Sequence, residues 1–548
     1  MSFKLKSLIP RSRWCLWSVV LFSAILCVGT VTVGDYGMSW DEPFRFKGGD
    51  SQLAYYSDLV SGKGVSAQTS SYSGLFDLPL AIVHEAFPEL GTRSQKGHIW
   101  SFCFGLIGLL SIWRVTARIG GERAGFFGLL LLATVPRYYG HMFFNPKDIP
   151  LAGMYALGVW AVVSLLSRLP KPAWRYVIAI GLAAGLALSA RIAGFLVLCY
   201  FGLFIALFLI AKYGGAAVRG QAIDVREVLS DVGVWALRGA VSGLVALAVL
   251  LIFWPTLHVN PFAGAGDALE TVQSYGWGGR VLMDGHFWDA QDLPIYYIPY
   301  WLMLTVPVSL QLLFLSAIVL GVSRLVSYAR GAGWPSAAAL LSRAVPVFAV
   351  LFPLAYLLYK DPTLYDGMRH YLFILPPMAC ACALALEWLI RKASQSGKRY
   401  LALVLQGGVG VAVLFVVADM VALHPYQYLY FNRMSGGLPA AYTRDETDYW
   451  GLSHKEAAEW LNEYVETLDP GGRRIFKVHL RYSRWMLQEH LNPERFEMSK
   501  ERDGADFFVS VTRFNLHQAY PEAEVLHVVE RQGVPLCFVF ELKTEPIP

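Results

Sequence analysis

The chain has 548 residues, of which 55% are hydrophobic and only 16% charged, and its formal net charge is +5. This composition excludes an ordinary soluble protein and is typical of a chain that crosses a membrane many times. The length leaves room for about eleven spans and one soluble domain. Six of the seven cysteines lie in apolar runs, so their pattern indicates neither a disulfide framework nor a cysteine-based zinc site.

The first membrane span is predicted from Trp14 to Val33, where twenty apolar or small residues follow one another without a charge. At a rise of ~1.5 Å per residue this run is ~30 Å long, which matches the hydrocarbon core of a bilayer. The basic residues that precede it are Lys4, Lys6, Arg11 and Arg13. By the positive-inside rule these residues place the amino terminus in the cytoplasm.

Ten further spans are predicted along the chain, at 99–117, 124–138, 149–167, 175–190, 192–211, 232–254, 295–320, 344–359, 371–390 and 401–422. Each connection that this count places inside holds at least three Lys or Arg residues when the adjoining ends of its two spans are included. The agreement predicts a multi-pass α-helical membrane protein with eleven spans. Its amino terminus is expected inside and its carboxyl terminus outside.

The remaining segments are predicted to lie outside and to meet on one face of the membrane. The two longest outer loops are 35–97 and 255–294, and the second is rich in aromatic residues, glycine and acids. That composition suits an amphipathic segment on the membrane surface, although an ordinary loop is an equal alternative. Residues 1–437 are therefore expected to form the transmembrane domain.

Residues 438–548 are predicted to form a small α/β domain outside the cytoplasm, because the composition becomes polar after Asp448. A helical pattern covers 454–467. Apolar runs typical of strands cover 475–480, 507–511, 525–529 and 536–542.

Charged residues gather at the predicted outer ends of the spans. The acids Asp41 and Glu42 follow the first span, and Lys147 and Asp148 open the fourth. The alternative for each acid is that it caps the helix that follows, with Pro43 in the first turn after Asp41.

Two more charged positions lie at the same predicted face. Arg191 interrupts two apolar runs at a tight outer turn, and Arg369 and His370 open the tenth span. Arg191 could reach the interface as a snorkelling side chain or face an interior cavity, where an arginine is a good partner for phosphate. Acids and cations on one face, with none through the middle of the spans, favour an active site at the outer interface over an ion pathway.

Four of these motifs together resemble the GT-C superfamily of integral-membrane glycosyltransferases. They are Asp41-Glu42, Lys147-Asp148-Ile149-Pro150-Leu151, the Arg191 turn and Tyr365-Asp366-Gly367-Met368-Arg369-His370. The likeness covers most of residues 14–437 and is strongest to the family 39-like branch, which includes protein O-mannosyltransferases and the aminoarabinose transferase of lipid A. It implies an enzyme of the bacterial inner membrane that takes a sugar from a polyprenyl phosphate donor. The acceptor is expected to be a glycan, a lipid or a protein, and no nucleic-acid partner is expected.

The resemblance also implies roles for individual residues in an inverting transfer. Asp41 is expected to accept the acceptor proton, with Glu42 and Asp148 positioning substrate or sharing that task. The candidates to bind the lipid phosphate or the sugar are Lys147, Arg191, Arg369 and His370. No cofactor is firmly predicted, because two carboxylates without a further ligand pattern do not establish a divalent cation between Asp41 and Asp148.

A polytopic transporter or lipid flippase is the alternative from another functional class. It predicts coupling charges within the spans and interrupted helices at matching positions of an inverted repeat, and the sequence has no such pairing. A third interpretation makes the outer domain a binding module anchored by the spans, but eleven spans exceed what an anchor requires.

Overall fold

The computed structural model describes residues 12–63, 73–259, 276–331 and 333–542. Each predicted span is matched by a helix: α1 Arg13–Thr32, α4 Arg93–Gly120, α5 Glu122–Ala133, α7 Asp148–Leu166, α8 Trp174–Leu188, α9 Leu196–Val218, α10 Val225–Phe253, α14 Val308–Ala329, α15 Ala337–Lys360, α16 Leu375–Gln395 and α17 Arg399–Leu423. Within the described ranges, nine helices are long and apolar enough to cross a bilayer, and α8 is a shorter apolar helix. The chain is therefore a multi-pass helical membrane protein, as predicted. Three of the basic residues before α1, at positions 4, 6 and 11, lie outside the described residues.

Two predicted spans are divided in the structure. The third, 124–138, is shared by the 12-residue α5 and by α6 (Pro136–Phe144), and α5 is not among the nine described helices that are long enough to cross a bilayer. The eighth, 295–320, is also divided. The structure divides it into α13 (Tyr297–Thr305) and α14, with Pro307 at the N-cap of α14. Proline lacks the N–H group that a continuous helix would need at this point, so the apolar run breaks there. Only α14 within this run is long enough to span the membrane.

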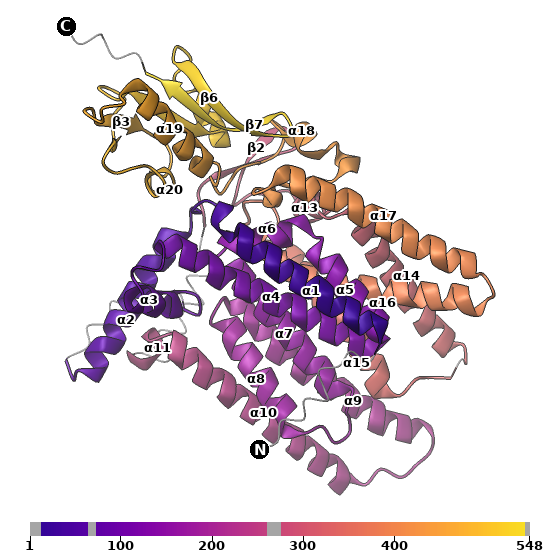
Figure 1. Cartoon of the computed structure of the whole chain (residues 1–548). Coiled ribbons are helices and arrows are strands. Elements are labelled where there is room, and N and C mark those ends of the chain that lie inside the picture. Colours follow the sequence, from indigo (N-terminus) through magenta and orange to yellow (C-terminus); the bar gives the residue numbers. More distant parts are fainter. Residues whose placement is uncertain (1–11, 64–72, 260–275, 332, 543–548) are drawn as a thin grey trace.

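Helices α4, α7 and α16 form the buried centre of the bundle (Figure 1). Small residues allow α4 and α7 to approach closely: a Cβ atom added at Gly153 would lie 2.3 Å from the carbonyl oxygen of Phe104. The outer helices expose large apolar side chains instead, among them Leu244 of α10, Leu312 of α14 and Leu414 of α17. Apolar side chains on this surface suit contact with lipid.

The carboxyl-terminal region forms a mixed five-stranded sheet in the order β4-β3-β5-β7-β6. Its strands are β3 Phe476–His479, β4 Phe496–Ser499, β5 Phe507–Val511, β6 Glu524–Arg531 and β7 Val534–Glu541. Strand β3 pairs parallel to β4 and β5, whereas β7 pairs antiparallel to β5 and β6. The predicted helix is α19 (His454–Leu468), and the short α20 (Trp485–Gln488) follows β3. The predicted small α/β unit is thus confirmed, while β4 has no counterpart among the predicted strands.

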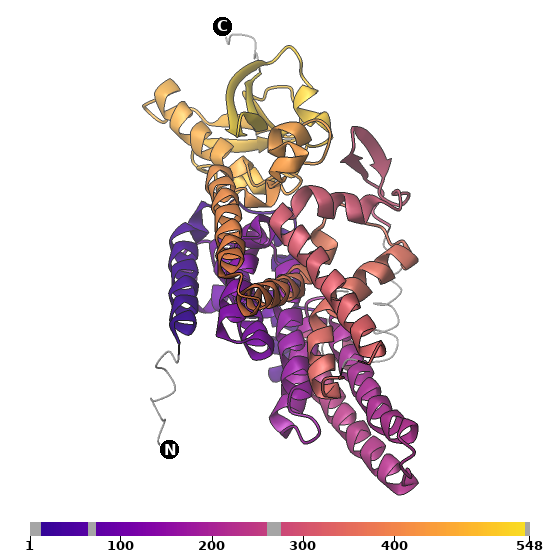
Figure 2. The same ribbon diagram turned by 90° about the vertical axis from the view of Figure 1, so that its right-hand side faces the viewer.

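This sheet lies at one end of the helical bundle (Figures 1 and 2). Segments predicted to be outside meet there: Lys455 of α19 donates to the carbonyl oxygen of Gly34, just after α1, and His424 after α17 contacts Asp35 at 2.8 Å. The predicted domain boundary at 437/438 falls at the start of α18 (Gly437–Ala441) and stays a prediction.

Between α10 and α13 the structure contains a two-stranded hairpin, β1 (Arg280–Met283) with β2 (His286–Asp289). The sequence predicted a surface amphipathic segment or a loop over 255–294, and the hairpin corrects that expectation for its described part. Residues 260–275 of that prediction lie outside the described residues. The Asp284-Gly285 turn, with positive φ at both residues, explains the hairpin locally. The remaining described α-helices of the chain are α2 Glu42–Val60, α3 Asp77–Ala86, α6 Pro136–Phe144 and α11 Thr256–Val259.

Candidate active site

Asp41 lies at the N-cap of α2, but its carboxylate makes no capping hydrogen bond to that helix. Instead Asp41 Oδ1 lies 3.1 Å from Lys147 Nζ and Asp41 Oδ2 lies 3.0 Å from Arg369 Nη1. The residue is only 6% exposed. The capping alternative is therefore wrong for the Asp41 side chain, which faces two cations from distant parts of the chain.

Glu42 is separated from Asp41 by its own set of contacts. Its Oε2 atom accepts a hydrogen bond from Ser39 N at 2.6 Å, and its Oε1 atom lies 3.2 Å from His98 Nε2 on α4. Both side chains of the Glu42–His98 pair are almost fully buried. The two adjacent carboxylates thus point to different partners, and Glu42 fixes the loop before α2 against α4.

Asp148 begins α7 and pairs with Arg191, whose Nη2 atom lies 2.6 Å from Asp148 Oδ1. Asn145 orients the turn: its Oδ1 atom accepts from Asp148 N at 2.8 Å, and its Nδ2 atom donates to Asp148 Oδ2 at 2.9 Å. The Arg191 side chain is 29% exposed, so it is partly accessible while it is held beside an acid. This geometry differs from that of a snorkelling arginine, which would point to the interface.

Arg369 begins the 3₁₀ turn η4 (Arg369–Ile374) that leads into α16. In addition to Asp41, it pairs with Asp366 through Nε at 3.2 Å. Its guanidinium lies over the rings of Trp450 and Tyr365 at 4.9 and 4.7 Å from their centroids. The two acids and two rings fix this guanidinium from several sides.

His370 also lies at this end, with its ring edge-on to Tyr365 at 4.6 Å between centroids. The predicted residues therefore fall into two groups, Glu42 with its partner His98 and the residues around Asp41. The group that we call the Asp41 cluster comprises Asp41, Lys147, Asp148, Arg191, Arg369 and His370.

The charges around Asp41 set its acidity. Burial by itself would raise the pKa of this carboxyl, but Lys147 and Arg369 outweigh burial and hold the pKa well below its usual range. A carboxylate with a lowered pKa stays ionised and paired at neutral pH, and this contribution to stability is lost only as pH falls through the lowered pKa. The same lowering makes Asp41 a weak proton acceptor while both cations face it.

Three residues that were given no role from the sequence extend the cluster toward the carboxyl-terminal sheet: Asp366, which stands in a motif quoted above, and Glu446 and Arg513, which do not. Asp366 bridges Arg369 to Arg513, whose Nη2 atom lies 2.5 Å from Asp366 Oδ1 and 3.5 Å from Glu446 Oε1. Asp366 adopts a left-handed conformation, with φ of 58°, directly before Gly367. The Asp-Gly pair was a usable turn signal for Asp366, whereas nothing in the local sequence singled out Arg513 or Glu446.

The carboxylates of the cluster already have cationic partners. A divalent ion between Asp41 and Asp148 would have to displace Lys147, Arg369 or Arg191 from contacts of 2.6–3.1 Å. Among the residues that the structure describes, no group of three or more His, Cys, Asp or Glu side chains gathers as a metal site would require. The side chains of the Asp41 cluster are therefore better arranged to bind an anion than a metal ion.

Comparison with known proteins gives one family match. Residues 80–219 match the family model described as dolichyl-phosphate-mannose-protein mannosyltransferase. The search of curated proteins gives no match.

Comparison with solved structures gives matches at low sequence identity. ArnT from Cupriavidus metallidurans in the apo state is 14% identical with a TM-score of 0.48, over 96% of this chain and 98% of that one. The same protein bound to undecaprenyl phosphate is 14% identical with a TM-score of 0.43, over 95% of this chain and 98% of that one. The oligosaccharyltransferase AglB from Archaeoglobus fulgidus, in complex with an inhibitory peptide and a dolichol-phosphate, is 12% identical with a TM-score of 0.46. The match covers 92% of this chain and 70% of that one. The match over residues 80–219 confirms the resemblance that the sequence motifs indicated.

Proposed function

We propose that this chain is a glycosyltransferase that moves a sugar from a polyprenyl phosphate donor to an acceptor at the outer face of a bacterial inner membrane, with inversion and without an essential metal ion. The observation that carries the proposal is the Asp41 cluster, in which three cations and two carboxylates meet at one end of the membrane helices. The family match over residues 80–219 supports the same reaction class.

The proposed reaction assigns opposite tasks to acids and cations. The acceptor oxygen or nitrogen attacks the anomeric carbon, the bond from that carbon to the phosphate oxygen breaks, and its electron pair stays on the phosphate. Asp41 takes the acceptor proton, and Lys147, Arg191 and Arg369 stabilise the negative charge that builds on the departing polyprenyl phosphate. Attack opposite the leaving group inverts the configuration at that carbon.

The donor itself prepares the base in this scheme. Lys147 and Arg369 hold the pKa of Asp41 low in the resting protein. A bound phosphate draws those cations toward its own oxygens, so the pKa of Asp41 rises and the carboxylate becomes a stronger proton acceptor when the sugar is in place.

This coupling predicts a particular pH dependence. A base acts only when deprotonated, so a higher pKa in the donor complex moves the acid limb of kcat to higher pH than the acid limb of kcat/KM, which reports the free enzyme. Initial rates between about pH 4 and pH 8 should show an acid limb at saturating donor and none at limiting donor, because the limb of the free enzyme lies below this range. Coincident limbs would mean that donor binding leaves Asp41 unchanged.

Arg513 is expected to position Arg369 through Asp366 without contacting the donor. Arg513→Gln removes the 2.5 Å contact to Asp366, and we expect kcat to fall about 10- to 100-fold, as when the orienting partner of a ligating side chain is lost. The matched control is Arg502→Gln, which breaks an exposed ion pair with Glu522 in the same sheet region. Steady-state kinetics and unfolding temperatures of both variants decide the matter: equal kcat values for the parent and Arg513→Gln would remove the positioning role.

The proposed orientation places the carboxyl-terminal sheet outside. Cys537 is fully buried in β7, so labelling of the native thiol is not informative. We therefore expect Lys500→Cys, at an exposed position, to react with a membrane-impermeant thiol reagent in intact spheroplasts. Ser396→Cys, in the connection between α16 and α17, should react only after the membrane is breached. The reverse pattern would invert the topology.

Donor cleavage tests the proposed function against the transporter alternative. Purified protein incubated with a polyprenyl phosphate sugar should release polyprenyl phosphate, detected by chromatography of the lipid fraction. A transporter or flippase would leave the donor intact in detergent while moving it between leaflets of a vesicle. Intact donor with transbilayer movement would replace this proposal by that alternative.

A further inference from the structure

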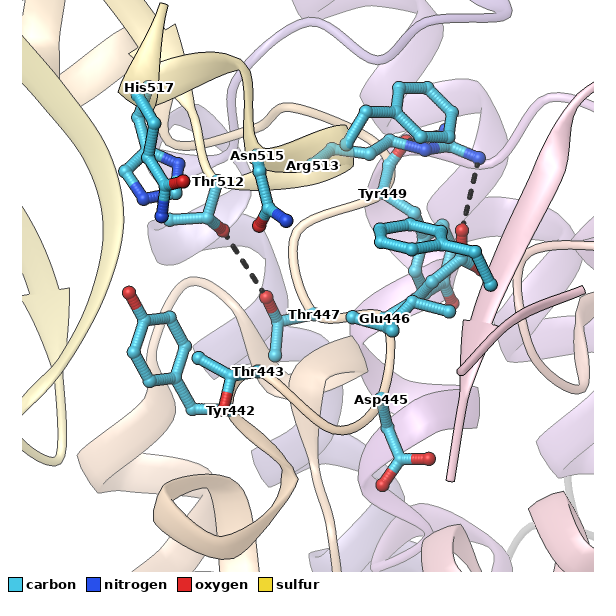
Figure 3. Close-up of a pocket in the computed structure, with 14 residues that line it drawn as sticks. Tyr442, Thr443, Asp445, Glu446, Thr447, Tyr449, Thr512, Arg513, Asn515 and His517 are labelled. Atoms are coloured by element: carbon cyan, nitrogen blue, oxygen red, sulfur yellow. Dashed lines mark hydrogen bonds and ion pairs between the residues drawn. The ribbon is translucent and has the colours of Figure 1, made fainter. Parts of the chain in front are cut away.

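A pocket lies beside the Asp41 cluster, between the β1–β2 hairpin, the segment 442–449 and the turn η7 (Arg513–Gln518) (Figure 3). Arg513 belongs to both places, since it lines this pocket and pairs with Asp366 of the extended cluster. The pocket therefore adjoins the proposed donor site from the side of the carboxyl-terminal sheet.

The backbone around this pocket is held in an unusual conformation. Thr443, Phe514 and Asn515 all line it, and all have positive φ, of 66°, 55° and 56°. Positive φ is uncommon in residues other than glycine, and such strain is concentrated at binding and catalytic sites. Three strained positions around one cavity indicate that its shape has a use.

Glu446 is the polar group of the pocket that the protein leaves least satisfied. It is 5% exposed and has Arg513 at 3.5 Å, yet neither of its carboxylate oxygens accepts a hydrogen bond of good geometry from the described residues. Its neighbour Asp445, by contrast, accepts from Tyr300 Oη at 2.6 Å and from Arg444 Nε at 2.9 Å. Arg513 and the backbone N–H of Asp366 face this carboxyl, so only part of its hydrogen-bonding capacity is used.

The chemistry of the lining favours one class of ligand. Hydroxyl and amide groups of Thr447, Thr512 and Asn515 face the cavity (Figure 3), and the two hydroxyls lie 3.5 Å apart. Phe287 and Phe514 add apolar ring surface. Arg513, the arginine of the lining, is already paired with Asp366, so a phosphate would gain little charge stabilisation here. A neutral or amine-bearing ligand rich in hydroxyl groups meets these conditions better than an anion does.

We propose that this pocket binds a saccharide unit of the acceptor, with Glu446, Thr447, Thr512 and Asn515 hydrogen-bonding its hydroxyl groups. Its identification as the acceptor site rests on the proposed function, whereas saccharide binding itself does not. Burial raises the pKa of Glu446 to about 8 even though Arg513 opposes the rise, so at neutral pH this carboxyl can donate as well as accept.

The test is saturation-transfer NMR on the full-length protein in nanodiscs prepared without glycoside detergents. The probes are the methyl glycosides of glucose, galactose, mannose, glucosamine and N-acetylglucosamine, together with a short serine- and threonine-containing peptide. At least one glycoside should receive saturation from the protein. Millimolar inorganic phosphate should not displace it, because the Arg513 cation in the lining is already paired with Asp366.

Two variants connect that signal to the pocket. Thr447→Val combined with Thr512→Val should weaken binding of the glycoside about fivefold for each lost hydrogen bond, and Glu446→Gln should weaken it as a separate isosteric change. Thr467→Val, at an exposed position at the end of α19, is the matched control and should bind like the parent. Unfolding temperatures establish that each variant is folded.

Three outcomes would overturn the inference: no glycoside signal, a signal that only the peptide gives, or a glycoside signal unchanged in both pocket variants. Because the measurement contains no donor lipid, it can fail while polyprenyl phosphate release succeeds, and the reverse also holds. Failure of the pocket is thereby distinguished from failure of the proposed function.

Discussion

Asp41→Asn should lower sugar transfer by about 10²- to 10⁴-fold, the usual cost of removing a general base. The amide keeps the shape of the side chain but cannot take the acceptor proton. Transfer of a radiolabelled sugar from the polyprenyl phosphate donor, measured under single-turnover conditions with saturating donor, isolates this step. Near-normal transfer by a folded variant would remove Asp41 from the role of base.

The same substitution should also lower the unfolding temperature, because Asp41 is buried between Lys147 and Arg369. Breaking a buried ion pair costs up to about 5 kcal/mol, although Asp366 remains as a partner for Arg369. Glu42→Gln is the matched control, since Glu42 is equally buried but contacts Ser39 and His98. Transfer should fall less in this control, and equal losses at both positions would point to joint positioning in place of a single base.

Arg191→Ala should lower the single-turnover rate by about 10²- to 10³-fold, the cost of removing one donor to a developing oxyanion. Arg191 is the most exposed of the three cations of the cluster, and its pairing with Asp148 holds it where the phosphate of a lipid carrier could reach it. The contact strengthens as the glycosyl bond breaks, so the loss should appear in the chemical step as well as in donor affinity.

Two further variants sharpen this result. Arg191→Lys should recover only part of the rate, because an ammonium does not match two phosphate oxygens as a guanidinium fork does. Arg433→Ala removes another arginine–aspartate pair, with Asp419, that lies outside the cluster, and its rate should equal that of the parent. If Arg191→Ala also matched the parent, Lys147 and Arg369 would be left as the phosphate ligands.

The sequence predicted the membrane helices well because hydropathy and the placement of basic loops follow directly from the bilayer. The predicted helix boundaries were wrong where a single residue determines them, as Pro307 does between α13 and α14. The β1–β2 hairpin was not predicted because each of its strands has only four residues, which is too short for a period-two pattern to be recognised.

The site was predicted less completely than the fold. Asp41, Lys147 and Arg369 were singled out because each stands beside an apolar run, where a charge is costly. Glu42 shared that signal, yet its side chain pairs with His98 on α4; adjacency in sequence does not fix where a side chain points. Arg513 could not be found this way, because it lies in a polar segment where an arginine is ordinary, and only the fold brings it to Asp366.

We expect the donor phosphate to bind at the Asp41 cluster. Equilibrium binding of polyprenyl phosphate to the parent, to Asp41→Asn and to Arg191→Ala tests this. Compared with the parent, Asp41→Asn should bind the lipid more tightly, since it removes a negative charge that competes for Lys147 and Arg369. Arg191→Ala should bind it more weakly than the parent. The uncharged polyprenol should bind to all three proteins with the same affinity. Equal affinities for polyprenyl phosphate in all three proteins would contradict the account.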